Sequence, residues 1–185
     1  MLMFKYVLES DLGQIFGESE SSGLVPGTTV VGEFSYSGEN PRAFQPAIFG
    51  LFEQEPETWR KFDDNEDVLG ELLWWMAKGD PEARFALLRV QLEESDQPWV
   101  YDWSPMQRYA QWGGVTGPTM LPSYLGSRVK SGVPISEYHG SYDLPEIVIF
   151  SRIPNERIDT IGLRVLTDIC PEDPAKKREV REFTF

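Results

Sequence analysis

The sequence predicts a single α+β domain over residues 1–185, with mainly antiparallel strands and with helices concentrated in the middle of the chain. Short apolar or β-branched runs occur near both ends, whereas apolar residues at helical spacing occur between them. The regular alternation of strand and helix that indicates a doubly wound parallel sheet is absent. Neither an internal repeat nor a long linker divides the chain, whose length is usual for one domain.

The first third of the chain is predicted to contain three strands and one short helix. Apolar residues at 3–7 indicate a strand, and the polar residues 9–11 precede a short helix that ends near Phe16. Residues 28–36 alternate and are rich in β-branched side chains, which indicates a second strand. The apolar run 47–52 is too short for a helix and therefore indicates a buried strand.

The middle of the chain is predicted to be the helical part. Residues 57–62 and 68–77 have apolar side chains at helical spacing. A serine and a proline precede residues 106–112, as at the start of many helices. Glycines and prolines then make residues 113–122 a loop, and residues 124–130 fit one or two further helical turns.

The remaining strands follow from apolar runs separated by turn residues. Residues 84–92 and 99–103 are predicted to form a hairpin, because only a short polar turn separates them. Residues 146–150 give the strongest strand signal of the chain, and residues 160–166 give another. The charged and then alternating tail 176–185 is predicted to be an edge strand.

Composition excludes several classes of function. The 30 acidic and 17 basic residues give a net charge of −13, which opposes binding of nucleic acid through a broad basic face. The one cysteine, Cys170, excludes an internal disulfide, and the one histidine, His139, excludes metal sites that need two histidines, so no metal is expected. The glycine-rich signatures of nucleotide-binding loops are absent from the sequence.

The expected location is the cytoplasm, with no attachment to a membrane. The opening residues contain too short an apolar run for a secretion signal, and no apolar run of membrane-spanning length occurs in the sequence. The aromatic pair Trp74-Trp75 is either part of the core or a stacking surface for a planar ring. His139 is either an ordinary loop histidine or a residue that titrates near neutral pH.

One segment carries a specific hypothesis about chemistry. It is Glu146-Ile-Val-Ile-Phe-Ser-Arg-Ile-Pro-Asn-Glu-Arg-Ile158, in which a carboxylate opens an apolar strand and a turn follows through Pro154. A glutamate at such a strand end is held by rigid backbone and can face a pocket. This segment resembles the mono-ADP-ribosyltransferase-like family, including its toxin and DNA-modifying branches. The resemblance covers about 15 residues around this strand.

The resemblance implies a split sheet and an NAD-dependent transfer of ADP-ribose to a protein or nucleic-acid target. It makes Glu146 the catalytic carboxylate, which stabilises an oxocarbenium-like transition state by hydrogen bonding and charge. The first strand of the family holds NAD with an arginine or histidine, whereas this chain has Lys5 and Tyr6 there. Arg42 and the strand 47–52 take the place of the family's central motif. In the loop 131–145, the residues expected to face the target are Tyr138, His139 and Tyr142.

The alternative is an acidic protein without enzymatic activity, such as an immunity protein, an inhibitor or a nucleic-acid mimic that blocks a basic partner. Eight carboxylates lie between residues 53 and 71, which favours this interpretation through composition alone. The alternative predicts association that weakens with salt and does not depend on Glu146.

Overall fold

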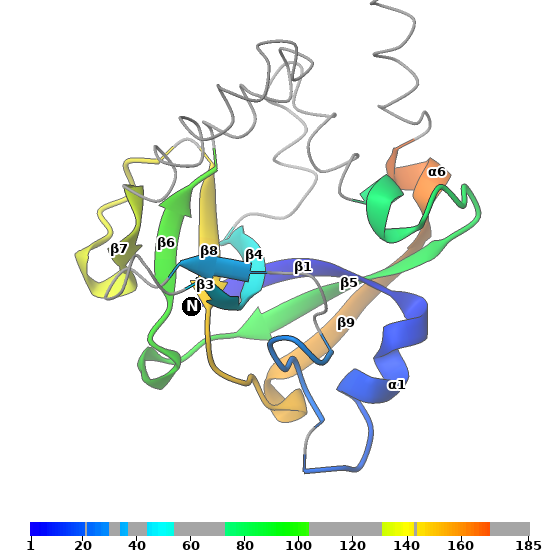
Figure 1. Ribbon diagram of the computed structural model, residues 1–185, viewed down its shortest axis with the longest axis horizontal. Coiled ribbons are helices and arrows are strands. Elements are labelled where there is room, and N and C mark those ends of the chain that lie inside the picture. The colour runs from blue at the N-terminus through cyan, green and yellow to red at the C-terminus, as the bar shows by residue number, and fades with distance from the viewer. Residues whose placement is uncertain are drawn as a thin grey trace, which may run out of the picture.

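The computed structural model describes residues 1–20, 22–29, 34–36, 44–53, 73–103, 131–142 and 144–170. Seven of the described strands form one antiparallel sheet in the spatial order β7-β6-β8-β4-β1-β5-β9 (Figure 1). They are β1 (Leu2–Leu8), β4 (Ile48–Phe52), β5 (Arg84–Gln91), β6 (Trp99–Asp102), β7 (Val133–Pro134), β8 (Pro145–Ile149) and β9 (Ile158–Val165). Strands β2 (Phe34–Tyr36) and β3 (Phe44–Pro46) pair with each other in a separate small sheet.

The described helices are short and do not concentrate in the middle of the chain, so that part of the prediction is wrong. Helix α1 (Leu12–Ile15) follows β1, and helix α6 (Leu166–Ile169) follows β9. Residues 73–76 are also helical, as predicted for the end of 68–77. The sequence missed α6 because Leu166 continues the apolar run of β9. The other predicted helices, at 57–62, 106–112 and 124–130, and the tail strand 176–185 lie outside the described residues.

The strand predicted at 28–36 is only partly correct. Phe34–Tyr36 form β2, but Thr28 and Thr29 belong to a turn, in which both of their amide groups donate to the carbonyl of Val25. Gly27 has φ +74°, a left-handed conformation that glycine adopts readily and that starts a turn where an alternating pattern predicts a strand.

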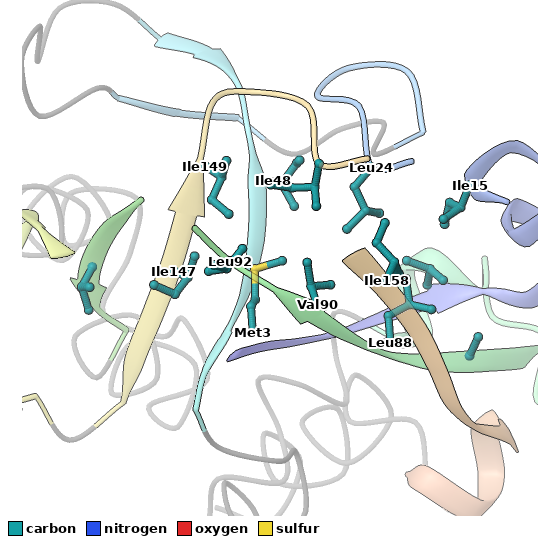
Figure 2. Close-up of a cluster of buried hydrophobic side chains, with 14 residues drawn as sticks. Met3, Ile15, Leu24, Ile48, Leu88, Val90, Leu92, Ile147, Ile149 and Ile158 are labelled. Atoms are coloured by element: carbon teal, nitrogen blue, oxygen red, sulfur yellow. The ribbon is translucent and has the colours of Figure 1, made fainter. Parts of the chain in front are cut away.

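Side chains alternate between the two faces of the main sheet, which we name the Met3 face and the Phe4 face after adjacent residues of β1. On the Met3 face, isoleucine, leucine and valine side chains from β1, β4, β5, β6, β8 and β9 pack under Ile15 of α1 and under Leu24. Figure 2 shows the 14 buried side chains of this cluster, which come from separate segments of the chain. Burial of this apolar surface is the main stabilising contribution to the fold.

The Phe4 face is covered at one end by helical segments. Phe4, Tyr6 and Phe85 pack with Leu73 and Trp74 of the helical turn 73–76 and with three residues of the α6 region. The three are Leu166, Ile169 and Cys170. Figure 1 shows this helical turn and α6 together beside one end of β5 and β9. Cys170 is buried among apolar residues, as a small hydrophobic side chain.

The predicted hairpin between 84–92 and 99–103 is wrong, although both strands exist. Strand β5 pairs with β1 and β9, and strand β6 pairs with β7 and β8, so three strands separate β5 from β6. The connection contains a 3-10 turn (Glu94–Asp96), after which Gln97 adopts a left-handed conformation with φ +48°. The connection therefore carries the chain across the sheet, because both edges of β5 already have a partner.

The ladder between β1 and β4 is short. It has two paired positions, Met3 with Phe52 and Phe4 with Leu51. Beyond them β1 continues only with β5, through Leu8, and β4 continues only with β8. Backbone pairing between β1 and β4 therefore ends at Phe4. Beyond it, the Lys5 side chain reaches from β1 to the carbonyl of Phe49 on β4.

Candidate functional site

Glu146 is the second residue of β8, a strand with a partner on both sides. Strand β8 pairs with β4 through Leu51 opposite Glu146, and with β6 through Tyr101 opposite Glu146. Because directly opposed residues share a face, Phe4, Leu51, Glu146 and Tyr101 form one row on the Phe4 face. The Glu146 side chain is therefore fixed by a backbone that is paired on both edges.

The Glu146 residue is buried, with 7% of its surface exposed. A carboxylate taken out of water costs free energy unless it is hydrogen-bonded or paired, so such residues commonly have a defined role. Its neighbour Tyr101 is 1% exposed. A methyl group at Gly132 would collide with the Tyr101 ring, which means that glycine at 132 lets the chain pass directly over this ring.

Hydrogen bonds hold the chain on either side of the Glu146–Tyr101 pair. The Ser131 hydroxyl accepts the backbone N–H of Asp102 at 2.9 Å, and the Leu144 carbonyl accepts the backbone N–H of Trp103 at 3.0 Å. The second of these bonds extends the β6–β8 ladder beyond its last pair, and the first joins β6 to the segment before β7. They keep the residue pair Glu146 and Tyr101 inside the sheet and away from a fraying end.

The two residues predicted on the first strand lie on opposite faces. Tyr6 is on the Phe4 face, buried, with its ring edge-on to Phe85 at a centroid distance of 6.4 Å. Lys5 is on the Met3 face, 6% exposed, and its Nζ donates to the Phe49 carbonyl at 3.0 Å. The structure thus brings Tyr6 to the same face as Glu146, with β4 between them, and directs Lys5 into the gap between β1 and β4.

The predicted target-facing residues lie before β8. Tyr138 packs edge-on against Phe52 at 5.7 Å and contacts Tyr142 at 5.0 Å, between ring centroids. Both tyrosines pack on the core of the Met3 face, opposite to Glu146. His139 is exposed beside them. Arg42 lies outside the described residues.

Burial raises the pKa of both tyrosines. For Tyr138 the loss of hydration is the main cause, partly offset by the backbone hydrogen bond at Tyr142, with a smaller contribution from the negative charge of Asp102. For Tyr142 burial is again the main cause of the raised pKa, followed by the charge of Asp102. The Tyr142 hydroxyl donates to the Ser131 carbonyl. This hydrogen bond links the loop to the segment that crosses Tyr101.

The sequence did not identify Tyr101 as a neighbour of Glu146. The alternation in 99–103 indicates a strand, but no local pattern states that this strand pairs with β8, which begins more than 40 residues later. The two residues of the aromatic pair Trp74-Trp75 differ in exposure. Trp74 is buried in the core, and Trp75 is 67% exposed. Among the described residues no group of three potential metal ligands is present.

A shallow hollow of about 460 Å³ lies on another part of the surface. Acidic residues Glu18, Glu20 and Glu156 line it together with Arg152, whose Nε donates to the Ser22 carbonyl at 2.7 Å. None of these residues belongs to the row that contains Glu146.

Comparisons with protein-family models, with curated proteins and with solved structures found no match. Within the described part of the chain, no helix is long and apolar enough to span a membrane.

Proposed function

We propose that this chain is an NAD-dependent ADP-ribosyltransferase-like enzyme that acts on a macromolecule, with Glu146 as its catalytic carboxylate. The observation that carries the proposal is the position of Glu146. It is a buried carboxylate at the opening of a central strand, in a row with aromatic and apolar side chains on one face of the sheet. The split-sheet fold of that family is part of the same proposal.

The short ladder between β1 and β4 supports a split sheet. Two paired positions hold these strands together, and each strand then keeps only its outer partner. The three strands that carry Tyr6, Leu51 and Glu146 are direct neighbours in the sheet. Side chains that are far apart in the sequence are thereby placed on one face of the sheet.

The residues of the Phe4 face fit the nicotinamide-ribose end of NAD in two respects. Glu146 supplies a carboxylate that can accept hydrogen bonds from ribose hydroxyl groups, and Tyr6 lies on the same face. The half-buried Phe49 supplies aromatic surface for a planar ring, and the buried Tyr101 supports Glu146 from the neighbouring strand. Lys5 differs from the arginine or histidine of the family, because it lies on the opposite face and its ammonium group donates to the Phe49 carbonyl.

In the proposed reaction, the bond between the ribose C1′ and the nicotinamide nitrogen breaks, and its electron pair leaves with nicotinamide. A nucleophilic atom of the target supplies the electron pair for the new bond to C1′ and releases its proton. Glu146 stabilises the positive charge that develops on the ribose, and its rigid setting avoids reorganisation during the step. Burial strengthens this electrostatic effect because the local dielectric constant is low.

The test uses labelled NAD with cell lysate and nucleic acid, and it measures label transfer by wild type, Glu146→Gln and Glu137→Gln. Glu137 is an exposed glutamate in the 3-10 turn (Ile135–Glu137), so it provides the same chemical change nearby. The proposal predicts transfer by wild type and Glu137→Gln, and a loss of about 100-fold or more in Glu146→Gln. Equal transfer by all three proteins would contradict it.

A second candidate function is the acidic binding protein that blocks a basic partner. The hollow favours it, because the exposed residues Glu18, Glu20 and Glu156 line one surface depression. This function predicts association that weakens as salt rises and that Glu146→Gln leaves unchanged. A pull-down with the triple variant Glu18→Gln, Glu20→Gln and Glu156→Gln separates it from the enzyme.

A further inference from the structure

Tyr101 of β6 has a neighbour on each side in its row across the sheet. Glu146 is opposite Tyr101 on β8. On the other side of β6, the last pair of the ladder with β7 is Val100 with Val133. The continuation of this antiparallel register places Gly132 opposite Tyr101. Because directly opposed residues share a face, Glu146 and Gly132 flank Tyr101 on the Phe4 face.

The Tyr101 ring lies against the backbone of Gly132. A methyl group built on Gly132 would lie 2.3 Å from Cε1, 2.8 Å from Cζ and 2.9 Å from Cδ1 of this ring. The ring therefore occupies the place that a side chain at position 132 would take. Since Gly132 and Glu146 are on opposite sides of Tyr101, the ring leans away from the Glu146 carboxylate.

The backbone conformation at Gly132 does not itself require glycine. Its φ angle is outside the left-handed region, in contrast to those of four other glycines in the described part of the chain. An alanine at this position would therefore meet no backbone strain. A glycine next to a strand often marks a place where another group approaches closely, and at Gly132 that group is the Tyr101 ring.

The segment that contains Gly132 is hydrogen-bonded to β6 and its flank on both sides of this glycine. The Ser131 hydroxyl accepts the backbone N–H of Asp102 at 2.9 Å, and the backbone N–H of Ile135 donates to the Pro98 carbonyl at 3.0 Å. These bonds hold the segment in place. A methyl group at position 132 would therefore displace the tyrosine ring more readily than the backbone.

The neighbours of Tyr101 limit the direction in which its ring can move. Trp99 is two positions earlier on β6 and so shares the same face. The centroids of the Trp99 and Tyr101 rings are 6.5 Å apart, which opposes movement along the strand toward Trp99. A ring displaced from Gly132 is therefore expected to move across the row, toward Glu146.

We propose that Gly132 is a positioning residue for the Glu146 carboxylate, because it keeps the Tyr101 ring on the β7 side of the row. This inference rests on the proposed function, in which Glu146 stabilises the charge on the ribose of NAD. A ring on the β7 side does not come between the carboxylate and the ribose. A displacement of about 1 Å in a catalytic arrangement can cost about 100-fold in rate.

The first test is NMR spectroscopy of the full-length chain, which needs no enzymatic activity. In wild type, nuclear Overhauser effects from the Tyr101 ring to the α-protons of Gly132 are expected to be stronger than those to the γ-protons of Glu146. In Gly132→Ala, the effects between the ring and the Glu146 γ-protons are expected to become stronger than in wild type.

The second test measures the release of nicotinamide from NAD. Gly132→Ala is expected to lower kcat by about tenfold or more with little change in KM, because Glu146 acts in the transition state. Gly162→Ala is the matched control. It adds the same methyl group to a glycine of β9 that has no atom within 4 Å of that position, so the rate of wild type is expected.

A rescue experiment separates the ring from a general effect on the fold. Tyr101→Val removes the ring atoms that the methyl group would meet. In this background, Gly132→Ala is expected to have little further effect on nicotinamide release, so the two changes are not additive. Circular dichroism confirms that each variant is folded.

The two tests have separate outcomes. A wild-type Tyr101 ring closer to the Glu146 γ-protons than to Gly132 would overturn the inference without any variant. So would a folded Gly132→Ala in which the ring does not move, or one in which the ring moves while the release rate stays that of wild type. Absence of nicotinamide release from wild type would contradict the proposed function, and the NMR measurement would still decide whether Gly132 holds the ring away from Glu146.

Discussion

At the scale of single residues, the buried Asp96 carboxylate is paired with the guanidinium group of Arg157. Asp96 is 7% exposed, and Arg157 donates to both of its carboxylate oxygens at 2.8 Å. Asp96 also accepts the backbone N–H of Glu93 at 2.8 Å, which closes the turn between β5 and β6. By accepting these hydrogen bonds, the Asp96 carboxylate raises the pKa of Arg157 above its usual range, so the guanidinium stays charged.

Replacing Arg157 with alanine is expected to lower the free energy of unfolding by about 3 kcal/mol, because it leaves the buried Asp96 carboxylate without its partner. Urea denaturation measures this loss. The matched control is Arg84→Ala, which removes an exposed ion pair with Glu9 and should cost less than about 1 kcal/mol. Similar losses for both variants would show that the buried pair has no special role in stability.

The raised pKa of Tyr142 and Tyr138 predicts a loss of stability in alkaline solution. A phenol whose pKa is higher in the folded state than its unfolded value of 10.0 binds its proton more tightly when folded. Its contribution is complete below pH 10 and is lost as the pH rises through the folded pKa. In Tyr142→Phe, the free energy of unfolding should therefore decrease less steeply with pH above pH 10 than in wild type. Urea denaturation at several pH values measures this slope. An unchanged slope would contradict this origin.

At the scale of elements, the close contact of β4 with β1 depends on Gly50 of β4. A methyl group there would collide with the Met3 side chain and approach the Phe4 carbonyl oxygen to 3.0 Å. Gly50 therefore permits β4 to lie against β1 at the point where their short ladder ends. Any larger residue would push these strands apart beside the row that contains Glu146.

Gly50→Ala is accordingly expected to destabilise the protein by about 1–3 kcal/mol through overpacking. Gly13→Ala is the control, because α1 offers open space around that position and alanine favours a helix. It should be neutral or stabilising by up to about 1 kcal/mol. Thermal and urea denaturation of both variants test this, and a harmless Gly50→Ala would mean that β1 and β4 adjust freely.

The sequence predicted where the strands lie in the chain better than it predicted which strands pair in the sheet. The apolar runs that became β1, β4, β5, β6, β8 and β9 were visible because period-two patterns are local. The pairing of β6 with β8 depends on contacts between segments far apart in the chain, and the short turn at 93–98 suggested a hairpin. Helix α6 was missed because four helical residues after a strand carry too little periodicity to detect.

The same limit applies to the candidate site. Glu146 could be selected from sequence because it opens a strong strand and belongs to a segment with a family resemblance. Its setting beside Tyr101, and the opposite faces of Lys5 and Tyr6, depend on register. A shift of one residue would exchange the two faces, and nothing local to either residue fixes that choice.

At the scale of the whole molecule, the sheet has one face closed by aliphatic packing and another that combines aromatic rings with a buried carboxylate. The Met3 face holds the larger cluster of buried isoleucine, leucine and valine side chains, and the Phe4 face holds a second buried cluster around Phe4, Tyr6 and Phe85. The Phe4 face presents Glu146 in a row with Leu51 and Tyr101. In the proposed function the chemistry belongs to the Phe4 face.

The most direct test of the proposed function is the release of nicotinamide from NAD by the purified chain, followed over time without any added target. Wild type and Glu137→Gln are expected to release nicotinamide at equal rates, whereas folded Glu146→Gln should be slower by about 100-fold or more. Circular dichroism confirms that each variant is folded. Release by Glu146→Gln at the wild-type rate, or its absence from wild type both here and with lysate or nucleic acid present, would contradict the assignment of Glu146 as a catalytic carboxylate.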